Sequence, residues 1–284
     1  MNNMDHEKEF IYTDKDFIFL SQLVTSHAGI CLPDGKKQLL YSRLTRRLRE
    51  LGLSSFSEYC AILNSNLDDE FPKFINAITT NVTHFFREYH HFEFLKKNIL
   101  PELVKKNKIN ISPKLRIWSA GCSTGEEAYS IAITVRETIP DLHRWDARIL
   151  ATDLDSDVLE KAKKGFYTMD KIKDVDTSRI GKWFRTIKNE NDKPLFEIKN
   201  NLREIIAFRQ LNLMDKWPMS GQFDVIFCRN VTIYFDKKTR TDLIDRFANI
   251  LSPGGYLILG HSESLYGITT RFTFLGKNMH KKIM

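Results

Sequence analysis

Residues 115–127 read LRIWSAGCSTGEE and decide the fold of the larger part of the chain. The run Leu115–Ser119 predicts a buried β-strand, and the glycine-bearing turn after it opens a helix predicted at residues 126–138. In α/β folds such a turn lets the backbone approach a ligand closely. The turn lacks the third glycine of a dinucleotide fingerprint and the Gly-Lys-Ser/Thr ending of a P-loop. It therefore predicts an α/β ligand site of another kind.

The sequence after Pro113 alternates apolar strands with helical segments, which predicts a mostly parallel sheet with helices on both faces. Further strands are expected at 147–152, 223–228 and 256–259, further helices at 155–164 and 239–251, and a closing hairpin at 272–283. After Gly165 the sequence contains residues that the alternating strand–helix pattern does not require. The alternation at Phe196–Lys199 and the apolar run Ile205–Phe208 predict a small antiparallel insert within residues 166–208.

Three carboxylates indicate the charge of the ligand. Glu126 and Glu127 at the helix start would repel a pyrophosphate and suit a cationic ligand, although they would also stabilise the helix dipole without any ligand. Asp153 follows the second strand, where α/β nucleotide folds hydrogen-bond ribose hydroxyls. A ribose together with a positive charge indicates S-adenosylmethionine.

The residues before this part follow a different pattern. From Asp14 to about Phe94 apolar residues recur every three or four positions, which predicts a domain of short helices. A longer helix is expected at 88–106, followed by a polar stretch that ends at Pro113. We therefore expect a helical domain at 1–93, a linker helix at 94–113 and an α/β domain at 114–284.

Composition excludes several classes of protein. With 284 residues, 42% hydrophobic and 28% charged, the chain is neither disordered nor fibrous. The polar start of the chain and the lack of a run of about 20 apolar residues predict a cytoplasmic protein. The four cysteines are scattered without a CxxC pair, so we expect reduced thiols and no structural metal. His90 and His91 are adjacent and have no HExxH pattern, so they are interpreted as structural or surface residues.

The net charge of +7 is unevenly distributed. Residues 1–93 hold 10 basic and 13 acidic residues, net −3, whereas residues 94–284 hold 33 and 23, net +10. The acidic first part nevertheless contains a concentrated basic stretch, here called the basic stretch: Lys36, Lys37, Arg43, Arg46, Arg47 and Arg49. Helical spacing gathers these residues largely on one side. They predict either a docking face for an acidic partner or an ordinary solvated helix face.

Sequence blocks spread over nearly the whole chain resemble the CheR family of chemotaxis receptor glutamate methyltransferases. The blocks are Thr79–Glu88 (TTNVTHFFRE), Trp118–Glu127 (WSAGCSTGEE), Ala151–Asp153 with Asp157–Leu159, Phe223–Asn230 (FDVIFCRN), Ile233–Asp236 (IYFD), and Pro253–Gly255 through Gly260–Glu263 (GHSE). The departures are small: Ala128 stands where the family usually has proline, and Thr232 where an apolar residue is common.

The resemblance implies a Rossmann-like methyltransferase fold, with a mixed seven-stranded sheet and a small β insert, preceded by an all-α domain. It implies that S-adenosylmethionine is held by Asn81, Thr83, Arg87, Gly121, Glu126 or Glu127, Asp153, Asn212, Leu213, Arg229 and Asn230. Arg87 suits the methionine carboxylate because its planar fork donates two hydrogen bonds; the alternative is an interdomain salt bridge. Tyr234 and Arg229 are implied to orient the substrate, and for Tyr234 the alternative is packing at a strand end.

The reaction implied is methyl transfer to glutamate side chains of chemoreceptors, with S-adenosylhomocysteine as product. Glutamate-rich receptor helices would dock on the basic stretch, and some family members also bind a receptor tail at the insert. The protein would then be a monomer that meets the membrane only through receptors and binds no nucleic acid. Two alternatives stay open: a methyltransferase for another substrate such as RNA, and a non-catalytic S-adenosylmethionine-binding signalling protein.

Overall fold

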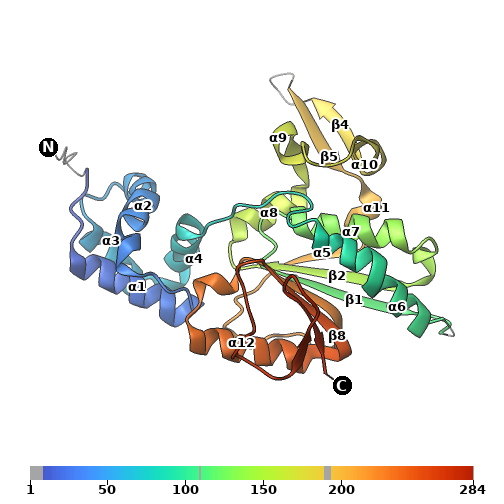
Figure 1. Cartoon of the computed structure of the whole chain (residues 1–284). Coiled ribbons are helices and arrows are strands. Elements are labelled where there is room, and N and C mark those ends of the chain that lie inside the picture. The colour runs from blue at the N-terminus through green and yellow to red at the C-terminus, as the bar shows by residue number, and fades with distance from the viewer. Residues whose placement is uncertain (1–8, 109, 189–192, 284) are drawn as a thin grey trace, which may run out of the picture. The chain divides into compact units, whose positions relative to one another are not determined.

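The computed structural model describes residues 9–108, 110–188 and 193–283 (Figure 1). Residues 1–8, which contribute to the prediction of a cytoplasmic protein, lie outside the described residues. The chain forms two compact units. One contains the residues up to Thr80 together with Tyr234–Asp236, and the other contains Asn81–Ile233 and the residues from Lys237 onward. This division falls before residue 93, the boundary expected from the sequence.

The first unit is helical, as predicted. Its helices are α1 (Asp14–Ala28), the short η1 (Asp34–Lys36), α2 (Lys37–Leu51), α3 (Phe56–Ser65) and α4 (Leu67–Ile78). Local signals set the ends: Thr13 and Asp16 form a capping box at the start of α1, and Ser55 caps α3. Buried apolar side chains at helical spacing hold the unit together, among them Leu20, Val24, Leu40, Leu44, Leu48, Phe56, Tyr59, Leu63 and Phe74.

The second unit is built on a seven-stranded mixed sheet. In spatial order its strands are β6 (Ile206–Gln210), β2 (Asp146–Asp153), β1 (Lys114–Ala120), β7 (Phe223–Cys228), β8 (Leu251–Leu259), β10 (Met279–Lys282) and β9 (Phe272–Phe274). The first five are parallel, and β10 and β9 form the antiparallel hairpin that was predicted. Ile117 in β1 lies opposite Ile149 of β2 and Val225 of β7, so the centre of the sheet is apolar.

Helices cover both faces of this sheet, as the alternating pattern predicts (Figure 1). The helices are α5 (His90–Phe94), the π-type turn η2 (Leu95–Ile99), α6 (Leu100–Lys106), α7 (Glu126–Thr138), η3 (Leu142–Arg144), α8 (Ser156–Lys164), α11 (Asn200–Arg203), η4 (Thr232–Tyr234) and α12 (Lys237–Ile250). In Figure 1, α5, α6 and α7 lie on one side of the sheet and α12 on the other.

The predicted helix at 88–106 is present with an irregular middle. The residues that join α5, η2 and α6 keep right-handed helical angles, so these segments form one continuous helix. Pro101 stands in its last part. Because proline has no N–H to donate and its ring crowds the carbonyl one turn earlier, the π-type turn occurs just before it.

The insert is a separate three-stranded antiparallel sheet in the order β3 (Phe166–Thr168), β5 (Pro194–Ile198), β4 (Phe184–Lys188). It also carries α9 (Met169–Ile172) and α10 (Thr177–Trp183). The alternation at Phe196–Lys199 correctly indicated β5. The assignment of Ile205–Phe208 to this insert was wrong: these residues lead into β6, which pairs in parallel with β2 in the main sheet. A short apolar run fits either sheet, because periodicity does not identify the partner strand.

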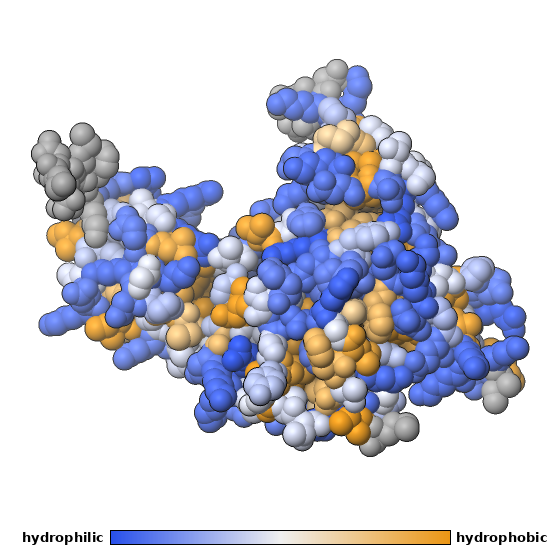
Figure 2. All heavy atoms as spheres, in the orientation of Figure 1, coloured by the Kyte–Doolittle hydropathy of each residue, from blue (hydrophilic) through white to orange (hydrophobic). Residues whose placement is uncertain are grey.

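Hydrophilic residues cover most of the surface visible in Figure 2. Among the described helices, none combines the length and the apolar character that crossing a bilayer requires.

Candidate functional site

The loops after β1, β2, β6 and β7 carry the predicted site residues of the α/β unit. After β1 the chain builds β2 and β6 on one side, and it later returns to place β7 on the other side of β1. Ligands of open α/β sheets bind outside the carboxyl ends of the strands at such a reversal. The topology therefore places the glycine turn, Asp153 and Arg229 at the end of the sheet where a ligand is expected.

Backbone strain concentrates in the loops after β1 and β7 and in the segment before α5. Four non-glycine residues there have positive φ: Phe86 (53°), Glu88 (55°), Ser123 (49°) and Asn230 (59°). Such angles cost free energy and persist where the surrounding structure enforces them, often at ligand sites. Apart from these four, the described residues show positive φ outside glycine at Lys277 and Asn278, which form the turn of the β9–β10 hairpin.

The glycine turn is held close to the sheet. The amides of Gly121 and Cys122 both donate to the carbonyl of Thr152, at 2.8 and 2.9 Å. Gly121 has φ 85°, and a Cβ at this position would overlap Cγ2 of Val231 in the loop after β7. Only glycine fits both the angle and the contact, so the backbone of the turn is open to a ligand.

Asp153 lies at the end of β2 and is partly exposed. Its carboxylate accepts hydrogen bonds from the amides of Ser123 (2.8 Å) and Asp155 (3.0 Å). Loss of hydration nevertheless raises the pKa of Asp153 to about 6. The carboxylate is therefore mostly ionised at neutral pH, held rigidly, and able to accept hydrogen bonds from ribose hydroxyls.

This pKa leads to a pH prediction. S-adenosylhomocysteine should bind about tenfold more weakly at pH 5 than at pH 7, because protonation removes the charge of Asp153 and one of its acceptor positions. Isothermal titration calorimetry across this range measures the effect. Burial also raises the pKa of Glu126, so the matched control is Asp153→Asn, whose affinity should depend less on pH. Equal pH dependence in the wild type and this variant would assign the effect to another group.

The two glutamates at the start of α7 differ in their surroundings. Glu126 is fully buried, accepts a hydrogen bond from the Thr124 hydroxyl at 2.6 Å, and lies 3.7 Å from the Lys171 ammonium. Its Oε1 has no hydrogen-bond partner among the described residues. Both oxygens of Glu127 are used, by the Ser119 hydroxyl (2.7 Å) and by Arg229 (3.0 Å). Oε1 of Glu126 pairs with the Lys171 ammonium at 3.7 Å but accepts no hydrogen bond from the described residues, so of the two glutamates it has the greater remaining acceptor capacity for an ammonium group.

Residues 81–88 pack on the α/β unit. The Asn81 amide donates to Asp155 at 2.7 Å, and the Ser123 hydroxyl donates to the Asn81 carbonyl at 3.3 Å. Further along, Lys171 donates to the carbonyl of Thr83 at 3.4 Å. Because of such contacts, Asn81 and the residues that follow it belong to the α/β unit. The same contacts place Asn81 beside the glycine turn and Thr83 beside Lys171 of α9.

Arg229 is almost fully buried at the end of β7. Besides Glu127, its guanidinium donates to the carbonyl of Arg87, lies 3.5 Å from a Glu88 oxygen, and lies 5.5 Å from the centre of the Phe92 ring. Arg229 thus ties the segment containing Arg87 to α7. Among the described residues, the Arg87 guanidinium makes one hydrogen bond, to the Val82 carbonyl at 2.9 Å.

The loop after β6 is fixed by a residue that the sequence analysis did not single out. Arg246 in α12 donates to the carbonyl of Leu213 at 2.6 Å and stacks 4.1 Å from the centre of the Trp217 ring. The Asn212 side chain accepts from the Met214 amide at 3.0 Å, and Leu213 is buried. No motif marks Arg246, because its role depends on a helix that is distant in sequence.

Tyr234 belongs by its contacts to the helical unit. Its carbonyl accepts from the Cys31 amide at 2.8 Å, and Phe235 forms a β-bridge with Ile30. The side chain is half-buried. In this unit the Arg43 guanidinium interacts electrostatically with Tyr234 and donates to Thr80 at 2.6 Å.

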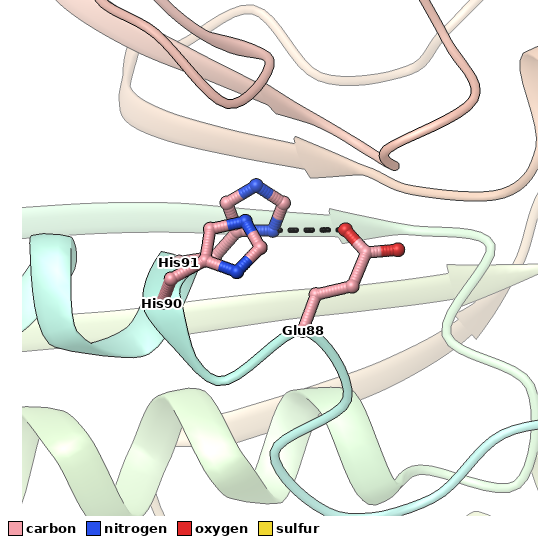
Figure 3. A group of neighbouring side chains, drawn as sticks. All are labelled: Glu88, His90 and His91. Atoms are coloured by element: carbon pink, nitrogen blue, oxygen red, sulfur yellow. Dashed lines mark ion pairs between the residues drawn. The ribbon is translucent and has the colours of Figure 1, made fainter.

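Glu88, His90 and His91 are the group of possible metal ligands found among the described residues (Figure 3). Figure 3 shows the Glu88 carboxylate facing the His91 ring, and the distance to Nδ1 is 3.4 Å. Nε2 of His91 lies 2.8 Å from the Lys277 carbonyl. Burial and the charge of Arg229 lower the pKa of His91 to about 4. Because Arg229 also lies beside Glu88, a divalent cation here would meet a positive charge, and the group supports no metal site.

The comparisons with known proteins agree with this geometry. Residues 15–79 match the family model described as "CheR methyltransferase, all-alpha domain", and residues 81–280 match "CheR methyltransferase, SAM binding domain". The chain is 42% identical over 246 residues to a "Probable chemotaxis protein methyltransferase" of Rhizobium etli, covering 86% of this chain and 91% of that protein. It is 40% identical over 271 residues to the "Chemotaxis protein methyltransferase" of Escherichia coli, covering 94% and 91%.

The site also suits the cofactor named by the family model. S-adenosylmethionine combines a ribose, an ammonium group and a cationic sulfur, and the α/β unit offers the acceptor Asp153 and the buried Oε1 of Glu126, which accepts no hydrogen bond from the described residues. The chain therefore belongs to the CheR family of S-adenosylmethionine-dependent methyltransferases.

Proposed function

We propose that this protein transfers the methyl group of S-adenosylmethionine to glutamate side-chain carboxylates of chemoreceptors, giving methyl esters and S-adenosylhomocysteine. The observation that carries this proposal is the match of both family models, which together extend from residue 15 to residue 280. The names of the similar proteins support a role in chemotaxis. The buried carboxylate of Glu126 beside the glycine turn, whose Oε1 accepts no hydrogen bond from the described residues, supports cofactor binding.

The residues of the α/β unit have distinct roles in this proposal. Asp153 accepts the ribose hydroxyls, Glu126 accepts the amino group, and Arg87 donates to the carboxylate of the methionine part. The remaining predicted contacts with the cofactor come from Asn81, Thr83, Gly121, Asn212, Leu213 and Asn230. Glu127 acts indirectly, because it fixes Arg229, which in turn holds the Arg87 segment.

The proposed reaction requires little proton transfer by the protein. When bound, S-adenosylmethionine supplies a methyl group on a cationic sulfur. A glutamate side chain has an ordinary pKa of about 4.3, so it is already a carboxylate nucleophile at neutral pH and needs no general base. The protein's contribution is to align the reacting groups and exclude water. Tyr234 orients the substrate carboxylate through its hydroxyl, whereas Arg229 contributes mainly by positioning.

The two glutamates of α7 should respond differently to substitution. Glu126→Gln should weaken S-adenosylhomocysteine binding by about tenfold, because a hydrogen bond to a charged group contributes about 1.5 kcal/mol or more. Glu127→Gln is the matched control: it should chiefly lower the thermal stability, because it removes the nearer of the two carboxylates that face buried Arg229. Calorimetric affinity and melting temperature separate the two effects. The reverse pattern would assign the amino group to Glu127.

The basic stretch is proposed to meet the glutamate-rich receptor segment, but much of its charge is paired. Arg47 makes a bidentate contact with nearly buried Glu70, at 2.7 Å on both sides, and is committed to the fold. Ion pairs also join Lys37 to Asp14, Arg46 to Glu50 and Arg49 to Glu9. Exposed pairs of this kind contribute little and exchange partners readily. The available part of the docking face is therefore Lys36 with the exposed Arg46 and Arg49.

A receptor tail is proposed to dock on the insert. Its sheet has two edge strands, β3 and β4, and an extended peptide can add to such an edge through main-chain hydrogen bonds. Phe166 in β3 and Met169 in α9 expose apolar surface near one edge.

The proposal is tested by incubating the protein with tritiated S-adenosylmethionine and receptor-containing membranes, then measuring methanol released by base. Base-labile label that disappears with Asp153→Ala is expected. Label on added RNA instead would show a different substrate, and cofactor binding without label on any receptor would indicate a non-catalytic signalling protein.

A further inference from the structure

A buried carboxylate, that of Glu263, lies in the loop after strand β8. It has no role in the cofactor and substrate contacts proposed above. Glu263 is 1% exposed. Its Oε2 accepts from the amides of Gly260 (2.6 Å) and Asn230 (2.7 Å). Its Oε1 accepts from the amides of Val231 (3.0 Å) and Thr232 (2.7 Å), and from the Thr232 hydroxyl (2.9 Å).

Four of these five hydrogen bonds fix one short segment, residues 230–232, here called the β7 loop, and the fifth comes from Gly260 after β8. Three consecutive amides of the loop point at one carboxylate, which requires a tight backbone curve, and Asn230 accordingly has φ 59°. A cluster of buried amide N–H groups without an acceptor would destabilise the folded state. The full charge of the carboxylate compensates it, because hydrogen bonds to ionised acceptors are the strong ones.

The β7 loop connects the two sets of residues assigned above. Its Val231 side chain stands against Gly121 of the glycine turn, so its position limits the space for the cofactor. It follows Arg229 directly and continues into η4, which ends at Tyr234. A displacement of the loop would therefore move a wall of the cofactor site.

Space around the carboxylate is also restricted. A Cβ at Gly260 would lie 2.7 Å from Nδ2 of Asn230 and 2.8 Å from Oε2 of Glu263. Gly260, the residue after β8, therefore packs closely against both Asn230 of the β7 loop and the Glu263 carboxylate. The position of the carboxylate is thus well defined.

We propose that Glu263 is a positioning residue for methyl transfer: its buried carboxylate holds the β7 loop in the strained shape in which Val231 stands against Gly121 and forms one wall of the cofactor site. This inference rests on the proposed function. A neutral amide cannot replace the carboxylate, because its NH2 group would face N–H donors and leave at least one pair of amides without an acceptor. An Asp side chain keeps the negative charge, but because it is shorter, its carboxylate lies farther from the amides.

The test uses Glu263→Gln and Glu263→Asp, with Glu137→Gln as matched control. Glu137 is also a largely buried carboxylate of the α/β unit, but it accepts from Arg179 (2.8 Å) and Trp183 (3.1 Å) in the insert. Three quantities are measured: hydrogen exchange of the amides of residues 230–232 and Gly260, melting temperature, and kcat with KM for methyl transfer to receptor membranes.

For Glu263→Gln we expect at least tenfold faster exchange of these four amides, unchanged exchange in β1 and β2, and at least a tenfold lower kcat. Glu263→Asp should recover part of both. The control should lose thermal stability while keeping its kcat. The proposal is overturned if Glu263→Gln keeps wild-type exchange in the loop, or if its kcat falls no more than that of the control. Should Glu263→Gln not fold, the Asp variant decides, because an exchange rate and a kcat equal to wild type would also overturn the proposal. Failure of the proposed function is distinguishable, since the wild type would then release no base-labile methanol.

Discussion

Replacing Asp153 with Asn should weaken the binding of S-adenosylhomocysteine by about 100-fold while leaving the protein folded. Two hydrogen bonds from ribose hydroxyls to an ionised acceptor contribute about 1.5 kcal/mol each, and their sum of about 3 kcal/mol corresponds to about two orders of magnitude. The variant also presents an NH2 group where the amides of Ser123 and Asp155 now donate. Isothermal titration calorimetry gives the affinity directly.

A suitable control is Asp224→Asn. Asp224 is also a β-strand aspartate whose pKa is raised by burial, and it accepts an amide hydrogen bond, from Arg116 at 2.9 Å. It lies near the start of β7, at the other end of the sheet from the ligand loops. Asp224→Asn should bind S-adenosylhomocysteine as the wild type does. Equal loss of affinity in both variants would mean that the effect at Asp153 is a general loss of structure.

Gly121→Ala should abolish detectable cofactor binding, and with it methyl transfer. The methyl group would be placed at φ 85° and would overlap Val231, so both the glycine turn and the β7 loop must move. Such a displacement affects the two segments that face the ligand. Calorimetry and the receptor methylation assay measure the loss.

Gly267→Ala separates backbone strain from the overlap. Gly267 has a comparable positive φ, 68°, but a Cβ there would meet no atom within 4 Å. This control should lose some thermal stability and keep its affinity for S-adenosylhomocysteine. Wild-type affinity in Gly121→Ala would contradict the placement of the cofactor at this turn.

The sequence alone predicted the architecture of the α/β unit well. The helix at 126–138 and the strand at 223–228 have the predicted bounds, and the hairpin turns at the predicted residues. These elements are long or bounded by glycine and proline, so local periodicity determines them. The run Ile205–Phe208 was misassigned because its partner, β2, is more than fifty residues away in the sequence.

The sequence did not reveal the partners of the candidate site residues. Sequence placed Glu126 and Glu127 together at one helix start, yet only the fold shows that Arg229 uses Glu127. For the same reason the roles of Arg246 and Glu263 were missed. Each contacts backbone atoms of a loop that lies elsewhere in the chain, and such contacts leave no motif.

The basic stretch also has charge partners that the sequence does not reveal. Helical spacing predicts that these side chains lie largely on one side, but the spacing carries no information about acidic neighbours on other elements. Glu70, which neutralises Arg47, is in α4. The docking face that remains is smaller than the sequence suggested.

The proposed methylation of receptor glutamates can be observed by mass spectrometry of receptor peptides after incubation with the protein and S-adenosylmethionine. We expect a mass increase of one methylene group, about 14 Da, on glutamate side chains of the receptor, reversed by mild base and absent with Asp153→Asn. Methyl groups found only on lysine, on RNA or on no receptor residue would contradict the proposal.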